Sequence, residues 1–215
     1  MITNLSDQNS LFSQFLSEIR NIDVQHDRLR FRRNLERMAE IMAYELSKTL
    51  SYKSEEIVTP LGETNVPLSS DEIVLATILR AGLPMHQGLL NYFDKADSAF
   101  ISAYRKHTSD EEFDIHVEYC ASPTLDNKVL VISDPMLATG SSMAMVYEAL
   151  KSYGNPKQLH IVCGIATEEG LNYLSKKVPR SAKIWVGAID DELTAQSYIV
   201  PGLGDAGDLA FGDKI

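Results

Sequence analysis

The chain has 215 residues, of which 44% are hydrophobic, and a formal net charge of −10 at pH 7, so it can bury a sizeable core as a single domain over residues 1–215. The acidic balance argues against a general binder of nucleic-acid backbones, and no apolar run approaches the roughly 20 residues that a membrane span needs. The two cysteines, Cys120 and Cys163, have no CxxC spacing, which predicts a cytoplasmic protein without a disulfide framework.

Residues 8–51 are predicted to be helical, because apolar side chains recur at three- and four-residue intervals, most clearly between Phe31 and Leu46. The rest of the chain alternates between apolar strands and helices. The strands are predicted at residues 73–79, 98–104, 113–120, 128–133, 158–165 and 182–189, and the helices at residues 84–93, 142–153 and 168–177. This alternation predicts an α/β fold in which helices flank both faces of a mostly parallel sheet, after an N-terminal helical segment.

Residues 128–142 combine an apolar strand, an acid, a loop of small residues and the start of a helix. Asp134 stands at the carboxyl end of the strand, where ligands bind in open α/β sheets. The loop at Thr139 and Gly140 leads into a helix whose free N–H groups and dipole favour an anion. We therefore predict that a phosphate binds at this loop and that ribose hydroxyls bind Asp134. An ordinary turn between strand and helix is the alternative, because the pattern is common.

Two arginines also follow predicted strands, so we expect them at the same edge of the sheet. Arg80 and Arg105 each carry a guanidinium fork that suits phosphate oxygens. Gly82 predicts a tight loop where the backbone approaches a ligand. For either arginine alone, an ion pair at the surface is an equally good interpretation in a chain with 30 acidic residues.

The segment at residues 202–207, Gly-Leu-Gly-Asp-Ala-Gly, matches the GxGxxG pattern of dinucleotide sites. That pattern requires a βαβ unit and an acidic residue about 20 positions further on, whereas eight residues follow Gly207 here. A dinucleotide site is therefore excluded. The glycine-bent backbone can instead present N–H and C=O groups to the planar edge of a base such as uracil.

Three segments resemble, in order, the signature segments of the uracil phosphoribosyltransferases: Leu-Arg-Ala-Gly-Leu at residues 79–83, Asp-Pro-Met-Leu-Ala-Thr-Gly at 134–140, and Tyr-Ile-Val-Pro-Gly-Leu-Gly-Asp-Ala-Gly-Asp at 198–208. The similarity runs from about residue 28 to the end, and the first 27 residues match poorly. The resemblance implies a type I phosphoribosyltransferase fold with a C-terminal base-binding loop. It implies transfer of the 5-phosphoribosyl group from 5-phosphoribosyl 1-diphosphate to uracil, giving UMP and diphosphate.

The resemblance also implies Mg²⁺ as the cofactor, carried mainly by the substrate rather than by a metal site of the protein. It implies a homodimer or a larger homo-oligomer, with GTP as an activator in part of the family. No membrane or nucleic-acid partner is expected.

The resemblance assigns roles to individual residues. Asp134, Arg105 and Asp205 are the implied catalytic residues, and Asp205 also reaches the phosphoribosyl substrate. The diphosphate is implied to bind Arg80 and Arg105. Uracil is implied to bind Ile199 and the backbone of Gly204, Asp205 and Ala206. The ribose and its 5-phosphate are implied to bind Asp134, Pro135, Met136, Leu137, Ala138, Thr139, Gly140, Ser141 and Ser142.

The chain departs from the family pattern at three places. Ser141 replaces the usual glycine, Leu209 replaces an arginine, and Lys106 with His107 replaces an acid. Because Leu209 cannot pair with a neighbouring carboxylate as an arginine could, we expect residues 198–208 to be less well braced. The departures leave three alternatives open: a catalytically degenerate homologue that binds uracil or its nucleotide, a pyrimidine-responsive RNA-binding regulator on the same fold, and a transferase for another base.

Overall fold

The computed structural model describes residues 1–107 and 113–214, and describes residues 103–107 and 113–117 by their backbone. Its centre is a seven-stranded sheet with the strand order β1-β9-β8-β7-β4-β5-β6. All neighbouring strands in this sheet are parallel apart from β5 and β6. The mostly parallel sheet is therefore confirmed. Its strands are β1 (Ile2–Asn4), β4 (Ile73–Leu79), β5 (Asp97–His107), β6 (Phe113–Ala121), β7 (Val129–Leu137), β8 (Gln158–Thr167) and β9 (Lys183–Asp190).

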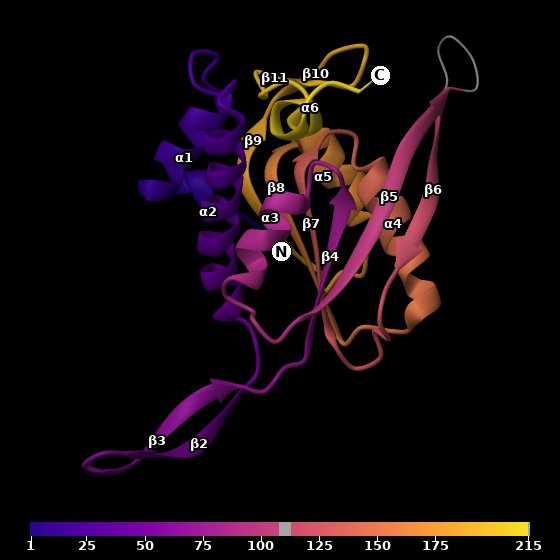
Figure 1. The fold of residues 1–215 in the computed structure, drawn as a ribbon. Helices are drawn as coiled ribbons and strands as arrows, with labels where there is room; N and C mark the ends of the chain where they lie inside the picture. The colour runs from indigo at the N-terminus through magenta and orange to yellow at the C-terminus, as the bar shows by residue number, and fades with distance from the viewer. Residues whose placement is uncertain (108–112, 215) are drawn as a thin grey trace.

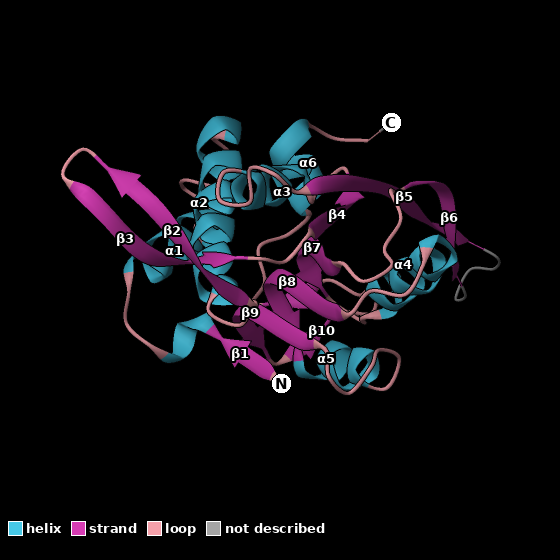
Figure 2. Cartoon of the chain, turned by 90° about the horizontal axis from the view of Figure 1, so that it is seen from below, coloured by secondary structure: helices cyan, strands magenta, loops and turns pink. Residues whose placement is uncertain are grey.

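Helices cover both faces of this sheet, as predicted (Figures 1 and 2). Leu75 and Val131 belong to the core on one face, whereas their neighbours Val74 and Leu130 belong to the core on the other. Successive strand residues point to opposite faces, so strands buried on both sides carry continuous apolar runs. The first face is covered by α1 (Leu11–Arg20), α2 (Arg28–Ser47) and α3 (Leu83–Leu90), and the second by α4 (Ser141–Leu150) and α5 (Glu168–Ser175).

The prediction of helix throughout residues 8–51 is wrong at residues 21–27, where a turn separates α1 from α2. The side chain of Asn21 accepts a hydrogen bond from the N–H of Asp23 at 2.9 Å. The side chain of Asp27 accepts one from the N–H of Arg30 at 3.0 Å and so caps α2. Short polar side chains of this kind compete with helical backbone hydrogen bonds, which explains the break.

The sequence did not predict β1 or the hairpin of β2 (Tyr52–Thr59) and β3 (Gly62–Ser69). The hairpin is a separate antiparallel sheet that projects from the body of the molecule (Figure 1). Nearly all of its residues are exposed, so its strands lack the alternation of apolar and polar residues that marks a half-buried strand. Strand β1 has only three residues and depends on pairing with β9 from the other end of the chain.

The C-terminal segment lies over the carboxyl ends of the parallel strands (Figure 1). It contains the short strands β10 (Glu192–Leu193) and β11 (Ile199–Val200) and the helix α6 (Ala206–Phe211). Two 3₁₀ turns, η1 (Leu5–Asp7) and η2 (Lys151–Tyr153), complete the described elements. Arg32 of α2 donates a hydrogen bond to the carbonyl of Ala210 at 2.7 Å, which ties α6 to the helical layer. Within the described residues, no helix is both long and apolar enough to cross a membrane.

Candidate active site

Asp134 lies inside β7, which continues four residues beyond the predicted strand end at residue 133. Its Oδ1 accepts a hydrogen bond from the N–H of Met136 at 3.0 Å, and its side chain is half-buried. Burial raises the pKa of Asp134 to about 7; the charge of Asp205 also raises it, while the N–H of Met136 opposes the rise. Asp134 therefore changes its charge near neutral pH.

The loop at residues 138–140 joins β7 to α4, where the sequence predicts a phosphate site. Gly140 has a φ of +76° and gives α4 no side-chain cap. A Cβ atom at Gly140 would lie 2.5 Å from the carbonyl oxygen of Gly170, so the position requires glycine. The hydroxyls of Thr139 and Ser141 lie 2.6 Å apart. Hydroxyls and the positive end of the helix dipole thus meet at one place.

Arg80 follows β4, and because β4 and β7 are parallel neighbours it lies at the same edge of the sheet as Asp134. Its Nη2 atom donates to Oδ1 of Asp208 at 2.9 Å and to the carbonyl oxygen of Gly212 at 3.2 Å. The Arg80 side chain is 40% exposed, and ion pairs between exposed side chains contribute little to stability. A phosphate oxygen could therefore replace the carboxylate.

Gly82 lies in a tight turn, as predicted, and its close neighbours are parts of the protein itself, so the approach of a ligand to its backbone stays a prediction. A Cβ atom there would overlap the hydroxyl of Thr77, and would lie 2.8 Å from the carbonyl oxygen of Ile78 and 3.0 Å from that of Ser133. The turn after Arg80 is thus pressed against β4 and β7.

Arg105 belongs to β5, where its backbone pairs with Ile115 of β6. Its side chain lies outside the described residues, as do those of Lys106 and His107. The diphosphate-binding and catalytic roles of Arg105 therefore stay predictions, and so does the effect of replacing the family's acid at this place.

Asp205 is the N-cap of α6. Its Oδ1 accepts hydrogen bonds from the N–H groups of Gly207 at 2.8 Å and Asp208 at 3.0 Å, and Nζ of Lys214 lies 3.4 Å from Oδ2. Burial raises the pKa of Asp205, but the backbone N–H groups and the charge of Lys214 outweigh burial and lower it below the ordinary value. Two interacting carboxyls, Asp134 and Asp205, thus have pKa values shifted in opposite directions, a feature of sites that divide acid and base roles.

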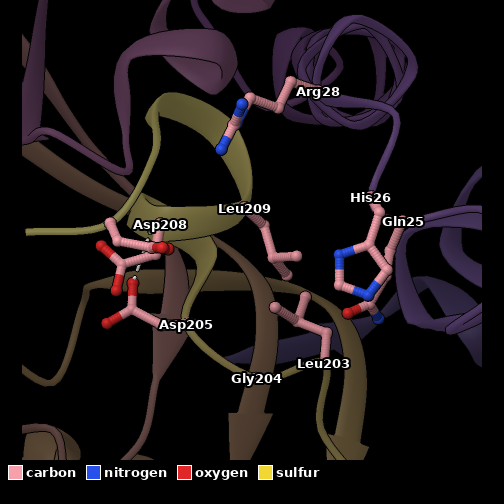
Figure 3. A pocket seen from close by; sticks show the side chains of 9 residues that line it. Gln25, His26, Arg28, Leu203, Gly204, Asp205, Asp208 and Leu209 are labelled. Carbon is pink, nitrogen blue, oxygen red and sulfur yellow. Dashed lines mark hydrogen bonds between the residues drawn. The ribbon is translucent and has the colours of Figure 1, made fainter.

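The residues assigned to the base belong to the segment at residues 198–208, which we call the base-binding loop. They lie around the start of α6. Ile199 and Ala206 are buried, whereas Gly204 is exposed, has a φ of +94° and has open space where a side chain would stand. A planar ligand could therefore approach the backbone of Gly204 closely. A cavity of about 270 Å³ opens beside this loop (Figure 3). It is lined by Gln25, His26, Arg28, Leu203, Gly204, Asp205, Asp208, Leu209 and Asp213.

The loop carries charged braces although Leu209 is aliphatic, and weaker bracing than with an arginine at this position stays a prediction. Asp208 pairs with Arg80, and Asp205 pairs with Lys214, while Leu209 packs against the apolar core. A third ion pair, between Arg20 and Asp190, lies at the base of the loop. No local sequence pattern indicates this pair, because 170 positions separate its residues.

Comparison with known proteins extends the resemblance to the whole chain. A family model described as uracil phosphoribosyltransferase matches residues 6–213. A uracil phosphoribosyltransferase of Porphyromonas gingivalis is 53% identical over 214 residues, covering 100% of this chain and 99% of the relative. One of Thermococcus sibiricus is 38% identical over 212 residues, covering 97% and 89%. The prediction that the first 27 residues match poorly is therefore wrong.

Solved structures agree with this relationship. A protein from Aquifex aeolicus superposes with a TM-score of 0.88 at 30% identity, over 100% of both chains. A hypoxanthine phosphoribosyltransferase from Staphylococcus aureus superposes with a TM-score of 0.51 at 17% identity, over 74% of each chain, which indicates a shared fold alone. The fold is that of the type I phosphoribosyltransferases. Matched along nearly its whole length, the chain belongs to the uracil phosphoribosyltransferase family.

Proposed function

We propose that this chain transfers the 5-phosphoribosyl group from 5-phosphoribosyl 1-diphosphate to uracil, releasing UMP and diphosphate. The observation that carries the proposal is the meeting of three parts at one sheet edge. The phosphate loop follows Asp134, the base-binding loop contains Asp205, and Arg80 is paired with Asp208 next to that loop. The charge of Asp205 acts on the carboxyl of Asp134, which is expected when both groups face one ligand.

The proposed roles follow from the charges that develop during transfer. As diphosphate leaves the anomeric carbon, the ribose gains positive charge and the leaving group gains negative charge. Asp134 accepts hydrogen bonds from the ribose hydroxyls and places negative charge beside the ribose. The loop at Thr139 holds the 5-phosphate, and Arg80 exchanges Asp208 for a diphosphate oxygen. The lowered pKa of Asp205 makes it a weak base, so we assign the uracil proton to water.

We also propose Mg²⁺ as the cofactor, bound mainly through the diphosphate. The described residues contain no group of three or more carboxylate, histidine or cysteine side chains that could hold a metal. Asp134 and Asp205 offer carboxylate oxygens, which suit a hard cation that retains several waters. When bound, Mg²⁺ would supply positive charge to the leaving diphosphate.

An assay of UMP and diphosphate formation tests the proposed activity. Uracil, cytosine, orotate and hypoxanthine are offered as competing bases, with and without Mg²⁺. We expect UMP as the product, dependence on Mg²⁺, and little reaction with the other three bases. The variant Asp134→Asn should form UMP more slowly than wild type. Asp94→Asn, a change of the same kind at an exposed site, is its control and should not. Failure of the wild-type protein to form UMP would favour a binding homologue or a regulator.

We further propose that the chain forms a homodimer or a larger homo-oligomer. The hairpin of β2 and β3 exposes Val58 to 79% and Leu61 to 100%, and a two-stranded hairpin is marginally stable by itself. Sedimentation should give at least twice the 23.9 kDa chain mass, and Val58→Asp should reduce it. Glu55→Gln is the control on the same strand. A wild-type mass of one chain would contradict the proposal. Activation by GTP, added to the same assay, stays a prediction.

The two cysteines support the predicted cytoplasmic location, which we include in the proposal. Cys120 and Cys163 are free thiols, as is usual in a reducing compartment. Burial raises the pKa of both thiols, so neither is an activated thiolate. Fractionation of the source cells would test the location.

A further inference from the structure

The N-terminal helix α1 reaches the base-binding loop through one ion pair. Arg20, the last residue of α1, donates from Nη1 and Nη2 to the two carboxylate oxygens of Asp190, at 2.9 and 2.8 Å. Asp190 ends β9 and is 6% exposed, while Arg20 is 21% exposed. A two-bond contact of this kind sets the relative orientation of the side chains as well as their distance.

The same carboxylate holds the backbone of the loop. Oδ2 of Asp190 accepts a hydrogen bond from the N–H of Gly202 at 2.9 Å, and Nη1 of Arg20 lies 3.4 Å from the carbonyl oxygen of Gly202. Gly202 is buried and has a φ of +55°, and a Cβ atom there would overlap the carbonyl of Ile199. The ion pair therefore contacts both the N–H and the carbonyl oxygen of Gly202, in a turn that requires glycine.

This turn lies between the two parts of the chain assigned to uracil, Ile199 and residues 204–206. The end of α1 is itself held in place, because Nε2 of Gln25 donates to the carbonyl of Arg20 at 3.1 Å. Gln25 and Gly204 line the same cavity (Figure 3). The segment at residues 20–25 and the base-binding loop thus pack together.

We propose that Arg20 is a positioning residue for base recognition. It acts through Asp190 to hold the turn at Gly202, and with it the backbone at residues 204–206, in the geometry that receives uracil. Neither Arg20 nor Asp190 needs to contact substrate. The expected change in the KM for uracil rests on the proposed transfer to uracil, whereas the expected loosening of the loop does not. Because the bonds of this pair end on Gly202, between Ile199 and Gly204, we expect its loss to affect the KM for uracil more than the KM for 5-phosphoribosyl 1-diphosphate, to which Asp205 is also assigned.

Kinetic constants of matched variants test the proposal. Arg20→Ala should raise the KM for uracil about tenfold, with kcat and the KM for 5-phosphoribosyl 1-diphosphate within about twofold of wild type. Arg20→Lys keeps the charge but cannot form the two-bond fork, so its KM should be intermediate. Asp190→Asn should resemble Arg20→Ala, and the double variant should be no worse, because the two residues act as one unit.

The matched control is Arg30→Ala. Arg30 joins α2 to α1 through an exposed pair with Glu18 at 3.1 Å, so its loss should leave all three constants unchanged. A merely structural role of Arg20 would reduce the folded fraction and lower the apparent kcat without changing the KM for one substrate.

Hydrogen exchange of the substrate-free protein gives a test that is independent of activity. In Arg20→Ala, the amides of residues 199, 200 and 202–204 should exchange about tenfold faster than in wild type, while amides 129–133 of β7 should not change. If Arg20→Ala does not fold, Arg20→Lys takes its place in both measurements. Unchanged exchange in the loop, or equal changes in the KM of both substrates, would overturn the proposal. If wild type forms no UMP, the proposed function fails, and exchange alone decides this inference.

Discussion

The carboxyl of Asp134 combines a raised pKa with a proposed role that uses negative charge. The ionised carboxylate offers both of its oxygens as acceptors to the ribose hydroxyls and places negative charge beside the ribose, whereas the protonated carboxyl is neutral and uses one oxygen as a donor. Because the pKa of Asp134 is raised to about 7, part of the free protein is protonated at this carboxyl at neutral pH. Binding of a cationic metal or of donor hydroxyls would favour the ionised form, so substrate binding and proton release are expected to be coupled.

We predict that kcat/KM for 5-phosphoribosyl 1-diphosphate falls about tenfold per pH unit below pH 7, because protonation removes the acceptor. Asp134→Asn should lose about 2 to 4 kcal/mol of transition-state stabilisation and should lack this pH limb. Initial rates between pH 5.5 and 8.5 measure both effects. Turnover of the variant within about threefold of wild type would exclude the ribose assignment.

Asp134 should also destabilise the fold at neutral and higher pH. Its pKa is raised in the folded state, so its favourable contribution is complete below the ordinary pKa of 3.8 and is lost as pH rises through about 7. Asp134→Asn is therefore expected to raise the free energy of unfolding at pH 8 by about 1 to 3 kcal/mol. Urea unfolding at pH 8 measures this, with Asp94→Asn as the control. A lower free energy of unfolding in Asp134→Asn would show that the charged carboxylate does not destabilise the fold.

The Nη2 atom of Arg80 is shared between Asp208 and Gly212, so a diphosphate oxygen that takes this atom competes with Asp208. The pair is partly exposed, so its net contribution is about 0 to 1 kcal/mol. Asp208→Asn is expected to lower the KM for 5-phosphoribosyl 1-diphosphate by up to about fivefold, because it removes the competing carboxylate. Arg80→Ala should raise the same KM. An increase of this KM in Asp208→Asn would mean that Asp208 orients Arg80 for substrate.

At the scale of elements, the phosphate loop depends on contacts between α4, α5 and the end of β7. The hydroxyl of Thr167, the N-cap of α5, donates to the carbonyl of Ala138 at 2.7 Å and accepts from the N–H of Gly170 at 2.9 Å. Gly140 and Gly170 pack backbone against backbone. The start of α4 is thus held in place by the protein itself, so an anion that binds there would require little reorganisation of the loop.

Thr139→Val tests this loop. The change keeps the shape of the side chain but removes the hydroxyl that lies beside Ser141. We expect the KM for 5-phosphoribosyl 1-diphosphate to rise about tenfold, in line with the loss of one hydrogen bond to a charged group, and the KM for uracil to stay nearly constant. Weaker uracil binding instead would place the base at this loop.

At the scale of the whole molecule, two buried histidines make stability depend on pH. Burial lowers the pKa of His86 and of His160 from 6.5 to about 4. Nε1 of Trp185 donates to Nδ1 of His160 at 3.0 Å, so the neutral ring carries its proton on Nε2. Among the described residues, neither Nδ1 of His86 nor Nε2 of His160 has a hydrogen-bond partner. Protonation of either histidine would place a positive charge in the buried interior, on a ring with one nitrogen that lacks a hydrogen-bond acceptor within the described residues.

We therefore predict acid destabilisation. A lowered folded-state pKa means that the contribution of a histidine is complete above pH 6.5 and is lost as pH falls towards 4. Between pH 7.5 and pH 5, wild type should lose about 2 kcal/mol more free energy of unfolding than His160→Gln. Urea unfolding of both proteins at the two pH values measures the difference. Equal losses would show that His160 does not titrate as buried.

The sequence alone determined the parallel sheet, the loop at residues 138–142 and the segment at 198–208. Continuous apolar runs mark strands that are buried on both faces, and glycines with small polar residues mark loops, so this information is local. Residues exposed on both faces carry no such pattern, and the hairpin at residues 52–69 was therefore missed. The break at residues 21–27 was missed because side-chain capping competed with an apolar periodicity that continued across it.

Which charged side chains meet depends on the tertiary fold. The pairs Arg20 with Asp190 and Arg80 with Asp208 join residues 170 and 128 positions apart, and the pKa of Asp134 depends on Asp205 and on burial. Desolvation and Coulomb interactions act through distances in space, and sequence separation does not encode those distances. From the sequence, these arginines and aspartates could equally be exposed surface residues. In the fold they form ion pairs that hold the base-binding loop.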